Sequence, residues 1–475
     1  MNPAATRPRV LLISTARPTF VVGVAKEFAA SARTLIESLG ADVIGPQDLV
    51  MTPEDIDAAL PFLKEEVDLV VNLCASFSDA SPALALYEGL NRPVLLWSVR
   101  EPGPVGDRLW LNSLCGSNLY AHALVRAGSQ VRLLYGNPDE QHVAAYLARG
   151  IAGDLPVGEL LEPTQRERVD EAPVRSALET MRGRTLGLVS EAPAGFTPSQ
   201  FDPDILDSLF GLRVDHLSID EMFSRIDDVQ PDHCSTEQAA ARSAQPSLGA
   251  LDPEHLTKSA ATTVAMREWG TAKDLSAMAI RCWPEFPTQR GFCPCSSLSR
   301  IADEGTPTAC ERDVYGAVTM LLMQTLGSGL TYLVDTVDLN TENNSVRLWH
   351  CGSAATALAA DPDEATQFVH CNRKIGVAGN FPLKTGPVVM ARLTENNTEN
   401  GPDGLRLLIA AGESIPAVNH FQGNTAEVKL DVDAQSFVNS LVVGGFPHHT
   451  VLAWKDIRPQ LRTAADILGI PVTEW

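Results

Sequence analysis

Two acidic residues and a pair of histidines in this chain are of the types that bind a metal ion and move protons. They are Glu311, Asp335 and the adjacent His448 and His449. Carboxylate oxygens together with one imidazole suit a hard divalent cation. Such a cation acidifies a substrate that carries adjacent oxygens, while a neighbouring carboxylate transfers the proton. We therefore expect an enzyme that acts on a sugar-type substrate.

Each of these residues also has a structural explanation. Thr308-x-x-Glu311 before an apolar helix fits a capping box. Asp335 follows an apolar strand, where an aspartate commonly forms a turn. The histidine pair follows Gly444-Gly-Phe-Pro, a loop that can bring side chains to a cleft, and is the stronger functional indication. His350, a short distance after Asp335, is a further candidate.

Three other segments are rich in aromatic, charged and glycine residues. Arg17 and Phe20 follow the first predicted strand, Arg281 and Trp283 belong to the second segment, and Trp110–Gly116 is the third. A tryptophan in such a loop either packs on the core or contacts a ligand, and the sequence favours the two roles equally.

The composition limits the partners of the protein. Acidic residues exceed basic residues by 59 to 37, which gives a net charge of −22. This surplus repels phosphate backbones, so we expect no nucleic acid partner. No stretch resembles a signal peptide or a membrane span, which predicts a soluble cytoplasmic protein without membrane contact. Among nine cysteines only Cys293 and Cys295 are close neighbours, so neither a disulfide framework nor a structural zinc site is expected.

Residues 1–158 alternate β-branched runs with helical patterns, which indicates a Rossmann-like α/β domain with a parallel sheet. Ligands approach such sheets at the carboxyl ends of the strands. No G-x-G-x-x-G motif or Walker-type loop is present, so no nucleotide cofactor is expected. The predicted strands and helices are Arg9–Ser14, Asp68–Leu73, Pro93–Ser98 and Gln130–Tyr135, with Val21–Leu39, Pro82–Leu90 and Asn118–Ala127.

Two further domains are expected. Residues 159–346 form a second α/β domain that carries Glu311 and Asp335. Residues 347–475, in which strands alternate with Gly, Pro and Asn, form an antiparallel β domain with a terminal helix and carry His449. The elements predicted there are the strands Thr185–Ser190, Val388–Arg392, Leu405–Ile409 and Ala426–Leu430, and the helices Pro253–Lys273, Asp313–Leu326 and Trp454–Leu468.

Several short motifs together carry a resemblance to a known group of enzymes. They are Asn112-Ser-Leu-Cys-Gly116, Cys282-Trp-Pro-Glu285, Ala309-Cys-Glu-Arg-Asp313, Asp335, Trp349-His-Cys-Gly352 and the Gly-Gly that precedes His448-His-Thr-Val451. In these motifs the chain resembles the L-fucose isomerase and L-arabinose isomerase superfamily, and within it the fucose isomerase-like branch. The resemblance covers nearly the whole length. It implies two Rossmann-like α/β domains followed by a β-barrel-like C-terminal domain.

The resemblance also implies roles for the candidate residues. Glu311 and Asp335 would bind the metal and serve as the acid/base pair, and His449 would be the third ligand. His350 lies where arabinose isomerases have another histidine ligand, so it is a candidate for the same role. The metal would be Mn²⁺, or else Mg²⁺ or Co²⁺, since the ligand types do not choose among these ions.

The family assembles as homo-trimers or homo-hexamers with active sites at a subunit interface. Arg17 and Phe20 would then come from a neighbouring subunit and close the pocket. Trp283 and His448 are the other expected substrate contacts. Arg281 stands where we expect an amide such as glutamine, and its guanidinium would suit an anionic group on the substrate.

The expected reaction is metal-dependent aldose–ketose isomerisation by proton transfer through a cis-enediol. Two alternatives stay open. A lyase, an aldolase or an epimerase would use the same enediolate and differ in its product. A non-catalytic sugar-binding protein would keep the pocket but lose the metal dependence, which the complete set of Glu311, Asp335 and His449 argues against.

Overall fold

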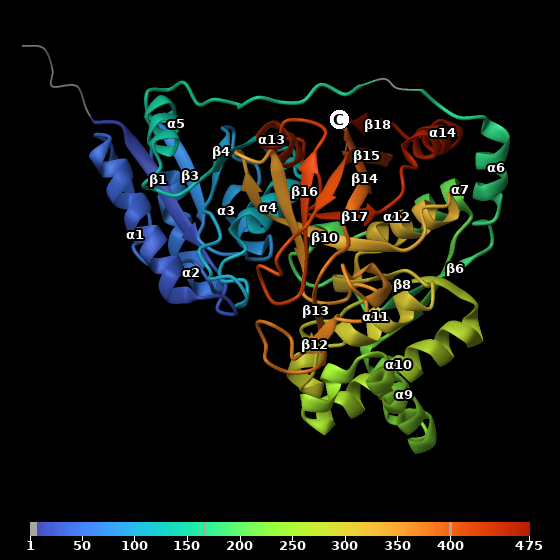
Figure 1. Ribbon diagram of the computed structural model, residues 1–475. Coiled ribbons are helices and arrows are strands. Elements are labelled where there is room, and N and C mark those ends of the chain that lie inside the picture. Colours follow the sequence, from blue (N-terminus) through green and yellow to red (C-terminus); the bar gives the residue numbers. More distant parts are fainter. Residues whose placement is uncertain (1–6, 165–166, 399–400) are drawn as a thin grey trace, which may run out of the picture.

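The computed structural model describes residues 7–164, 167–398 and 401–475, and these residues form three β-sheets with helices packed around them (Figure 1). The first sheet is parallel, with the strand order β2-β1-β3-β4-β5. Its strands are buried on both faces because helices cover the sheet. The elements are β1 Arg9–Thr15, β2 Asp42–Ile44, β3 Leu69–Cys74, β4 Val94–Ser98 and β5 Val131–Tyr135, with α1 Val22–Ser38, α2 Pro53–Ala59, α3 Ser81–Tyr87, α4 Ser113–Arg126 and α5 Gln141–Ile151.

The second sheet is also parallel, with the strand order β7-β6-β8-β9. Helix α10 begins with Asp252 as its N-cap and Pro253 at its first position, a combination that favours helix initiation. The elements are β6 Thr185–Val189, β7 Arg213–Leu217, β8 Leu275–Ile280 and β9 Thr308–Ala309, with α6 Glu171–Glu179, α7 Pro203–Phe210, α8 Ile219–Asp227, α9 Pro231–Ala244, α10 Pro253–Lys273, α11 Cys295–Asp303 and α12 Val314–Thr325.

The third sheet has the strand order β12-β13-β16-β11-β10-β17-β14-β15-β18. An additional antiparallel pairing of β15 with β16 closes six of these strands on themselves. The elements are β10 Thr331–Asn340, β11 Ser345–His350, β12 Thr366–Phe368, β13 Ala378–Pro382, β14 Gly386–Thr398, β15 Gly401–Ile415, β16 Asn424–Leu430, β17 His449–Ala453 and β18 Val472–Glu474, with α13 Ala434–Val443 and α14 Arg458–Leu468.

The α/β class expected from the sequence is confirmed, with one difference in the placement of a site residue. We predicted Asp335 in the second α/β segment, but its strand β10 pairs with β11 and β17 in the third sheet. The reason is that β10 continues as an antiparallel ladder to Asn340 instead of ending after Val334.

The third sheet, orange and red in Figure 1, lies between the blue N-terminal unit and the green and yellow second unit. Helix α4 packs against β4 and β5 of its own sheet and also against β10 and α13. This explains why α4 is buried almost all round instead of having one polar face. On the other side, α12 packs against β10, β14 and β17. The three sheets are therefore held together by shared apolar layers.

The loops at the carboxyl ends of both parallel sheets reach one pocket. Phe20 follows β1, Phe77 follows β3, Trp283 follows β8 and Glu311 follows β9, and all four side chains line the same cavity. Ligand sites in open parallel sheets occur at this end of the strands. The fold thus places the carboxyl ends of both parallel sheets against β10, the strand that carries Asp335. β10 is one of the six strands that close on themselves, which we call the barrel.

Helix α10 has 21 residues and is polar along much of its length. Within the described ranges, no helix combines the length and apolar character needed to cross a membrane.

Candidate active site

Strand pairing in the closed barrel brings Asp335 and His449 together. In the antiparallel ladder of β10 and β17 the two residues are direct cross-strand partners. His449 Nε2 lies 3.3 Å from Asp335 Oδ1, and both side chains are nearly buried. Asp335 lies inside its strand, so its explanation as a turn-forming residue is wrong. The ladder leaves its carboxylate available for a site.

Glu311 approaches the same point from the second sheet. It lies in a short turn, Cys310–Arg312, directly after β9, and its φ of 58° is in the left-handed region. This conformation costs a non-glycine residue about 1–3 kcal/mol and is typical of functional sites. Glu311 Oε2 lies 3.5 Å from His449 Nε2, and Trp283 Nε1 donates a hydrogen bond of 3.2 Å to Glu311 Oε1.

The capping explanation for Glu311 is also wrong. The N-cap of α12 is Asp313, whose side chain accepts a hydrogen bond from the backbone of Gly316. The hydroxyl of Thr308 instead donates to the carbonyl of Leu298. The Glu311 side chain is therefore free to take part in the pocket.

The arrangement of Glu311, Asp335 and His449 fits a divalent cation. Among the described residues, Asp335 Oδ1 and His449 Nε2 are buried without a hydrogen-bond partner. Ligand atoms held about 2.0–2.2 Å from one ion lie about 3.0–3.5 Å from one another. The separations of 3.3 Å and 3.5 Å around His449 Nε2 fall in this range. Glu311 lies close to His448 and His449, and Asp335 lies close to His350 and His449, so His449 is the imidazole that both carboxylates share.

Asp313 determines which nitrogen of His449 is available. His449 Nδ1 lies 2.8 Å from Asp313 Oδ2, so Nδ1 carries the proton and donates it, while Nε2 keeps its lone pair toward the site. Arg392 holds Asp313 through two bonds of 2.5 Å and 2.8 Å, and both side chains are fully buried. Burial alone would raise the pKa of Asp313, but Arg392 and His449 outweigh it and keep the pKa well below its usual range.

His350 lies in a different environment. Its Nδ1 lies 2.9 Å from the backbone nitrogen and 3.3 Å from the sulfur of Cys351, and although burial opposes it, the charges of Cys351 and Asp335 raise the pKa of His350 to about 10. The ring lies beside Asp335 and His449, with ring centroids of the two histidines 5.3 Å apart. A carboxylate on Nδ1 orients a histidine toward a cation with its Nε2, and His449 has such a partner in Asp313 whereas His350 does not. The geometry therefore favours His449 over His350 as the imidazole ligand.

Arg17, Phe20, Trp283 and His448 line the pocket together with Glu311, Asp335 and His350, while His449 lies behind this lining. The pocket encloses about 760 Å³ of space, part of it open to solvent. The guanidinium of Arg17 stacks over the Trp283 ring at 4.4 Å. Arg17 and Phe20 were expected from a neighbouring subunit, but here they come from the same chain. The reason is that the carboxyl end of β1 faces the barrel of its own chain.

Arg281 is not brought into the pocket. Its guanidinium forms an ion pair with Glu285 at 2.5–2.8 Å and donates to the carbonyl of Glu191. The sequence motif contains both Arg281 and Glu285, but residues 281–284 form a non-helical bend, so helical spacing does not reveal that the two side chains pair. A paired guanidinium has little capacity left for a substrate anion.

Sequence reasoning missed Asp313, Arg392 and Arg373. Asp313 stands two residues after Glu311 in a motif that we had selected, so its position was the available signal. Arg392 lies in a strand 79 positions away and had no signal, because only the fold brings it to Asp313. Arg373 lines the pocket from a loop between β12 and β13.

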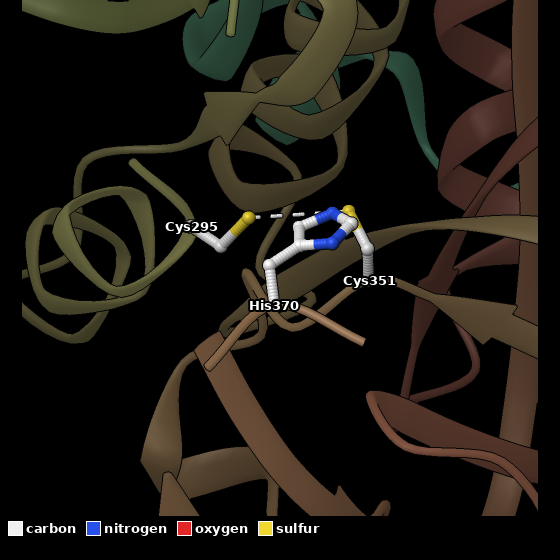
Figure 2. Close-up of side chains that lie close together, drawn as sticks. All are labelled: Cys295, Cys351 and His370. Carbon is white, nitrogen blue, oxygen red and sulfur yellow. Dashed lines mark hydrogen bonds between the residues drawn. The ribbon is translucent and has the colours of Figure 1, made fainter. Parts of the chain in front are cut away.

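Cysteines that are far apart in the sequence also meet at this pocket. Figure 2 shows Cys295 and Cys351 with the ring of His370 beside them, and the two sulfurs are 4.0 Å apart. All nine cysteines lie in the described part of the chain, and Cys351 alone among them is partly exposed. Hydrogen bonds from the thiols of Cys295 and Cys310, with His350 nearby, hold the pKa of Cys351 well below its usual range.

We expect Cys351 to be the most reactive thiol of the chain, since exposure and thiolate character both govern alkylation. Limiting iodoacetamide at neutral pH should label Cys351 before the other eight cysteines, as measured by mass spectrometry of tryptic peptides. The buried Cys234, outside the pocket, is the internal control. Preferential labelling of Cys234 would contradict this assignment of reactivity.

Comparison with known proteins gives full-length relatives. The chain is 33% identical to a sulfoquinovose isomerase of Alkalicoccus urumqiensis over 98% of this chain and 99% of that one. It is 31% identical to a sulfoquinovose isomerase of Priestia aryabhattai over 97% and 98%, and 29% identical to one of a Clostridium species over 95% and 96%. No family model matches the sequence.

A solved periplasmic component of an ABC-type sugar transport system from Hahella chejuensis matches 67% of this chain and 94% of that one at 15% identity. Its TM-score of 0.18 is too low to indicate a shared fold.

The carboxyl ends of two parallel sheets meet at a pocket lined by carboxylates and histidines, an arrangement typical of an α/β enzyme that acts on a sugar. At 33% identity over almost all of both chains, the protein belongs to the sulfoquinovose isomerase family. It is an aldose–ketose isomerase, as the sequence predicted. Its place in the fucose isomerase-like branch and its assembly as a trimer or hexamer stay predictions.

Proposed function

We propose that the protein is a metal-dependent isomerase that converts sulfoquinovose, an aldose with a sulfonate group, into the corresponding ketose. The observation that supports the metal dependence is that Glu311 and Asp335 both lie within 3.5 Å of His449 Nε2, while Asp335 Oδ1 and His449 Nε2 are buried without a hydrogen-bond partner among the described residues. The substrate is suggested by the names of the relatives. The active-site residues keep the roles predicted from the sequence.

Glu311, Asp335 and His449 would hold the cation, and Mn²⁺ suits this oxygen-rich set, as do Mg²⁺ and Co²⁺. A bound cation would supply Lewis-acid chemistry that makes the C2 proton of the sugar easier to remove. Asp313 and Arg392 fix His449 in the tautomer that this role requires. His350 lies beside Asp335 and His449, where its ring can donate a hydrogen bond to the bound sugar.

The two carboxylates divide the proton transfers. Glu311 is the more exposed of the two, with 18% of its side chain accessible against 9% for Asp335, so it is better placed to reach a carbon-bound proton. It takes the proton from C2 and returns it to C1 of the cis-enediol. His449 keeps the pKa of Asp335 below its ordinary value despite burial, so Asp335 can take the proton of the C2 hydroxyl and pass it to the C1 oxygen. The indole of Trp283 keeps Glu311 oriented.

A lyase, aldolase or epimerase that uses the same enediolate is the alternative, and the products distinguish it from an isomerase. The names of four relatives favour isomerisation.

Metal removal followed by reconstitution in D₂O tests the proposal. Chelator-treated protein should be folded and inactive, and added Mn²⁺ should restore conversion of sulfoquinovose to a ketose. NMR should show solvent deuterium at C1 of the ketose, because the carboxylate exchanges its proton with solvent before returning it. Full activity without any metal, or a ketose without deuterium under conditions of rapid exchange, would contradict the mechanism. Cleavage products would favour the lyase.

A further inference from the structure

The pocket is lined by side chains of both charges. Glu311 and Asp335 are among its carboxylates, and Arg17 and Arg373 are the arginines that line it. Arg17 comes from the loop after β1, while Arg373 comes from the loop between β12 and β13, so two distant segments supply the guanidiniums. A sugar bound with C1 and C2 beside the carboxylates would therefore lie in the same pocket as both arginines.

Both arginines lack an anionic partner. Within the residues that the structure describes, neither guanidinium forms an ion pair or a hydrogen bond, and Arg17 makes only its stacking contact with Trp283. Arg281, by comparison, is fully paired with Glu285. Arg17 and Arg373 are each half-buried, so the water that could replace a partner is limited.

Two like charges near one another are unfavourable without an anion between them. Burial lowers the pKa of Arg17, and the charge of Arg373 lowers it further, although Asp79 and Glu311 act in the opposite direction. The charges of the two guanidiniums therefore repel each other. The chain as a whole carries a charge of −22, which repels anionic substrates at long range. A pair of guanidiniums in the pocket would offset this repulsion locally and favour binding of an anionic group.

We propose that Arg17 and Arg373 form a subsite that binds the anionic group of the substrate and selects charged over neutral sugars. This inference rests on the proposed isomerase function, and it names the residues responsible for the specificity. A guanidinium donates two parallel hydrogen bonds to a group with several oxygens, as a sulfonate or a phosphate has. The stack on Trp283 pre-orients Arg17, which reduces the entropy lost on binding.

The experiment compares Arg373→Met with the wild type on three aldoses of similar size: sulfoquinovose, glucose 6-phosphate and the uncharged 6-deoxyglucose. Loss of one charge-assisted contact should raise KM for the preferred anionic sugar about 10–100-fold. The value of kcat should change only a few-fold, and kcat/KM for 6-deoxyglucose should not fall. The anionic sugar with the lower wild-type KM shows whether a sulfonate or a phosphate is preferred.

The matched control is Arg281→Gln, because Arg281 is an arginine of the same region that is already paired. It should leave the ratio of KM values for charged and neutral sugars unchanged. Arg17→Met is a second variant from an independent loop and should reproduce the effect of Arg373→Met. Equal losses on charged and neutral sugars in both variants would overturn the subsite, as would a charge preference that depends on Arg281.

A titration with methanesulfonate separates this inference from the proposed function, since it requires no turnover. Metal-free wild-type protein should bind methanesulfonate, and both Arg373→Met and Arg17→Met should bind it at least about 10-fold more weakly. Binding that is lost in these variants supports the subsite even if the wild type isomerises none of the sugars. Isomerisation of sulfoquinovose without any methanesulfonate binding would overturn the subsite while leaving the isomerase proposal intact.

Discussion

Replacing Glu311 by Gln is expected to lower kcat for sugar isomerisation by at least about 10³-fold, because the amide neither accepts a proton nor carries the charge that holds a cation. The protein should stay folded. Glutamine keeps an oxygen that accepts the bond from Trp283, and the neutral side chain relieves repulsion with Asp335. Steady-state kinetics at saturating Mn²⁺, with thermal unfolding measured in parallel, checks both parts.

The control for this prediction is Glu342→Gln, since Glu342 is an exposed glutamate in the turn between β10 and β11. It should have wild-type activity. A second comparison uses the double variant Glu311→Gln with Asp335→Asn, which should be hardly worse than the single variant, because residues that act as one unit give non-additive effects. A Glu311→Gln enzyme with near-normal kcat would remove Glu311 from the mechanism.

Local sequence patterns were sufficient for most elements of the parallel sheets. The strand predicted at Gln130–Tyr135 is β5, and the helix predicted at Pro253–Lys273 is α10 with the same bounds. Buried parallel strands give continuous apolar runs, and helix α10 has a cap and a proline at its start, so both signals are local. The last helix begins at Arg458 and not at Trp454, because β17 runs to Ala453 before it.

Closure of the barrel could not be derived from local patterns. The expectation of a β-barrel-like domain came from family resemblance, whereas closure depends on which strands pair, as β15 does with β16. The same limit explains the placement of Asp335. Its apolar run suggests a strand that stops at Val334, and only the partner strands show that the ladder continues.

The candidate site residues were selected by their residue type, because the sequence does not show which contacts each side chain makes. Glu311, Asp335 and His449 were selected as a set, and the structure brings them together. Arg17 and Arg281 were both selected as substrate contacts; Arg17 lines the pocket, whereas Arg281 is paired with Glu285, a partner that was not recognised. Whether a charged side chain is available depends on what it contacts, and contacts between distant segments are not encoded in local sequence.

Replacing Asp313 by Asn is expected to weaken both the fold and the metal site. Arg392 would be left as a fully buried charge without a carboxylate, which costs about 3–5 kcal/mol in the free energy of unfolding. His449 would lose the acceptor that fixes its tautomer, and Mn²⁺ affinity should fall about 10–100-fold. Urea unfolding and Mn²⁺ titration of the folded variant measure the two effects. Asparagine still caps α12, so helix initiation is not the cause.

The double variant Asp313→Asn with Arg392→Met separates the two effects. Removing both charges of a buried pair can recover stability, because the unpaired guanidinium is no longer present. Metal affinity should stay low, since asparagine at position 313 lacks the charge that favours a proton on His449 Nδ1. Recovery of stability without recovery of Mn²⁺ binding would establish Asp313 as the residue that positions His449. Recovery of both would show that Asp313 acts only by neutralising Arg392.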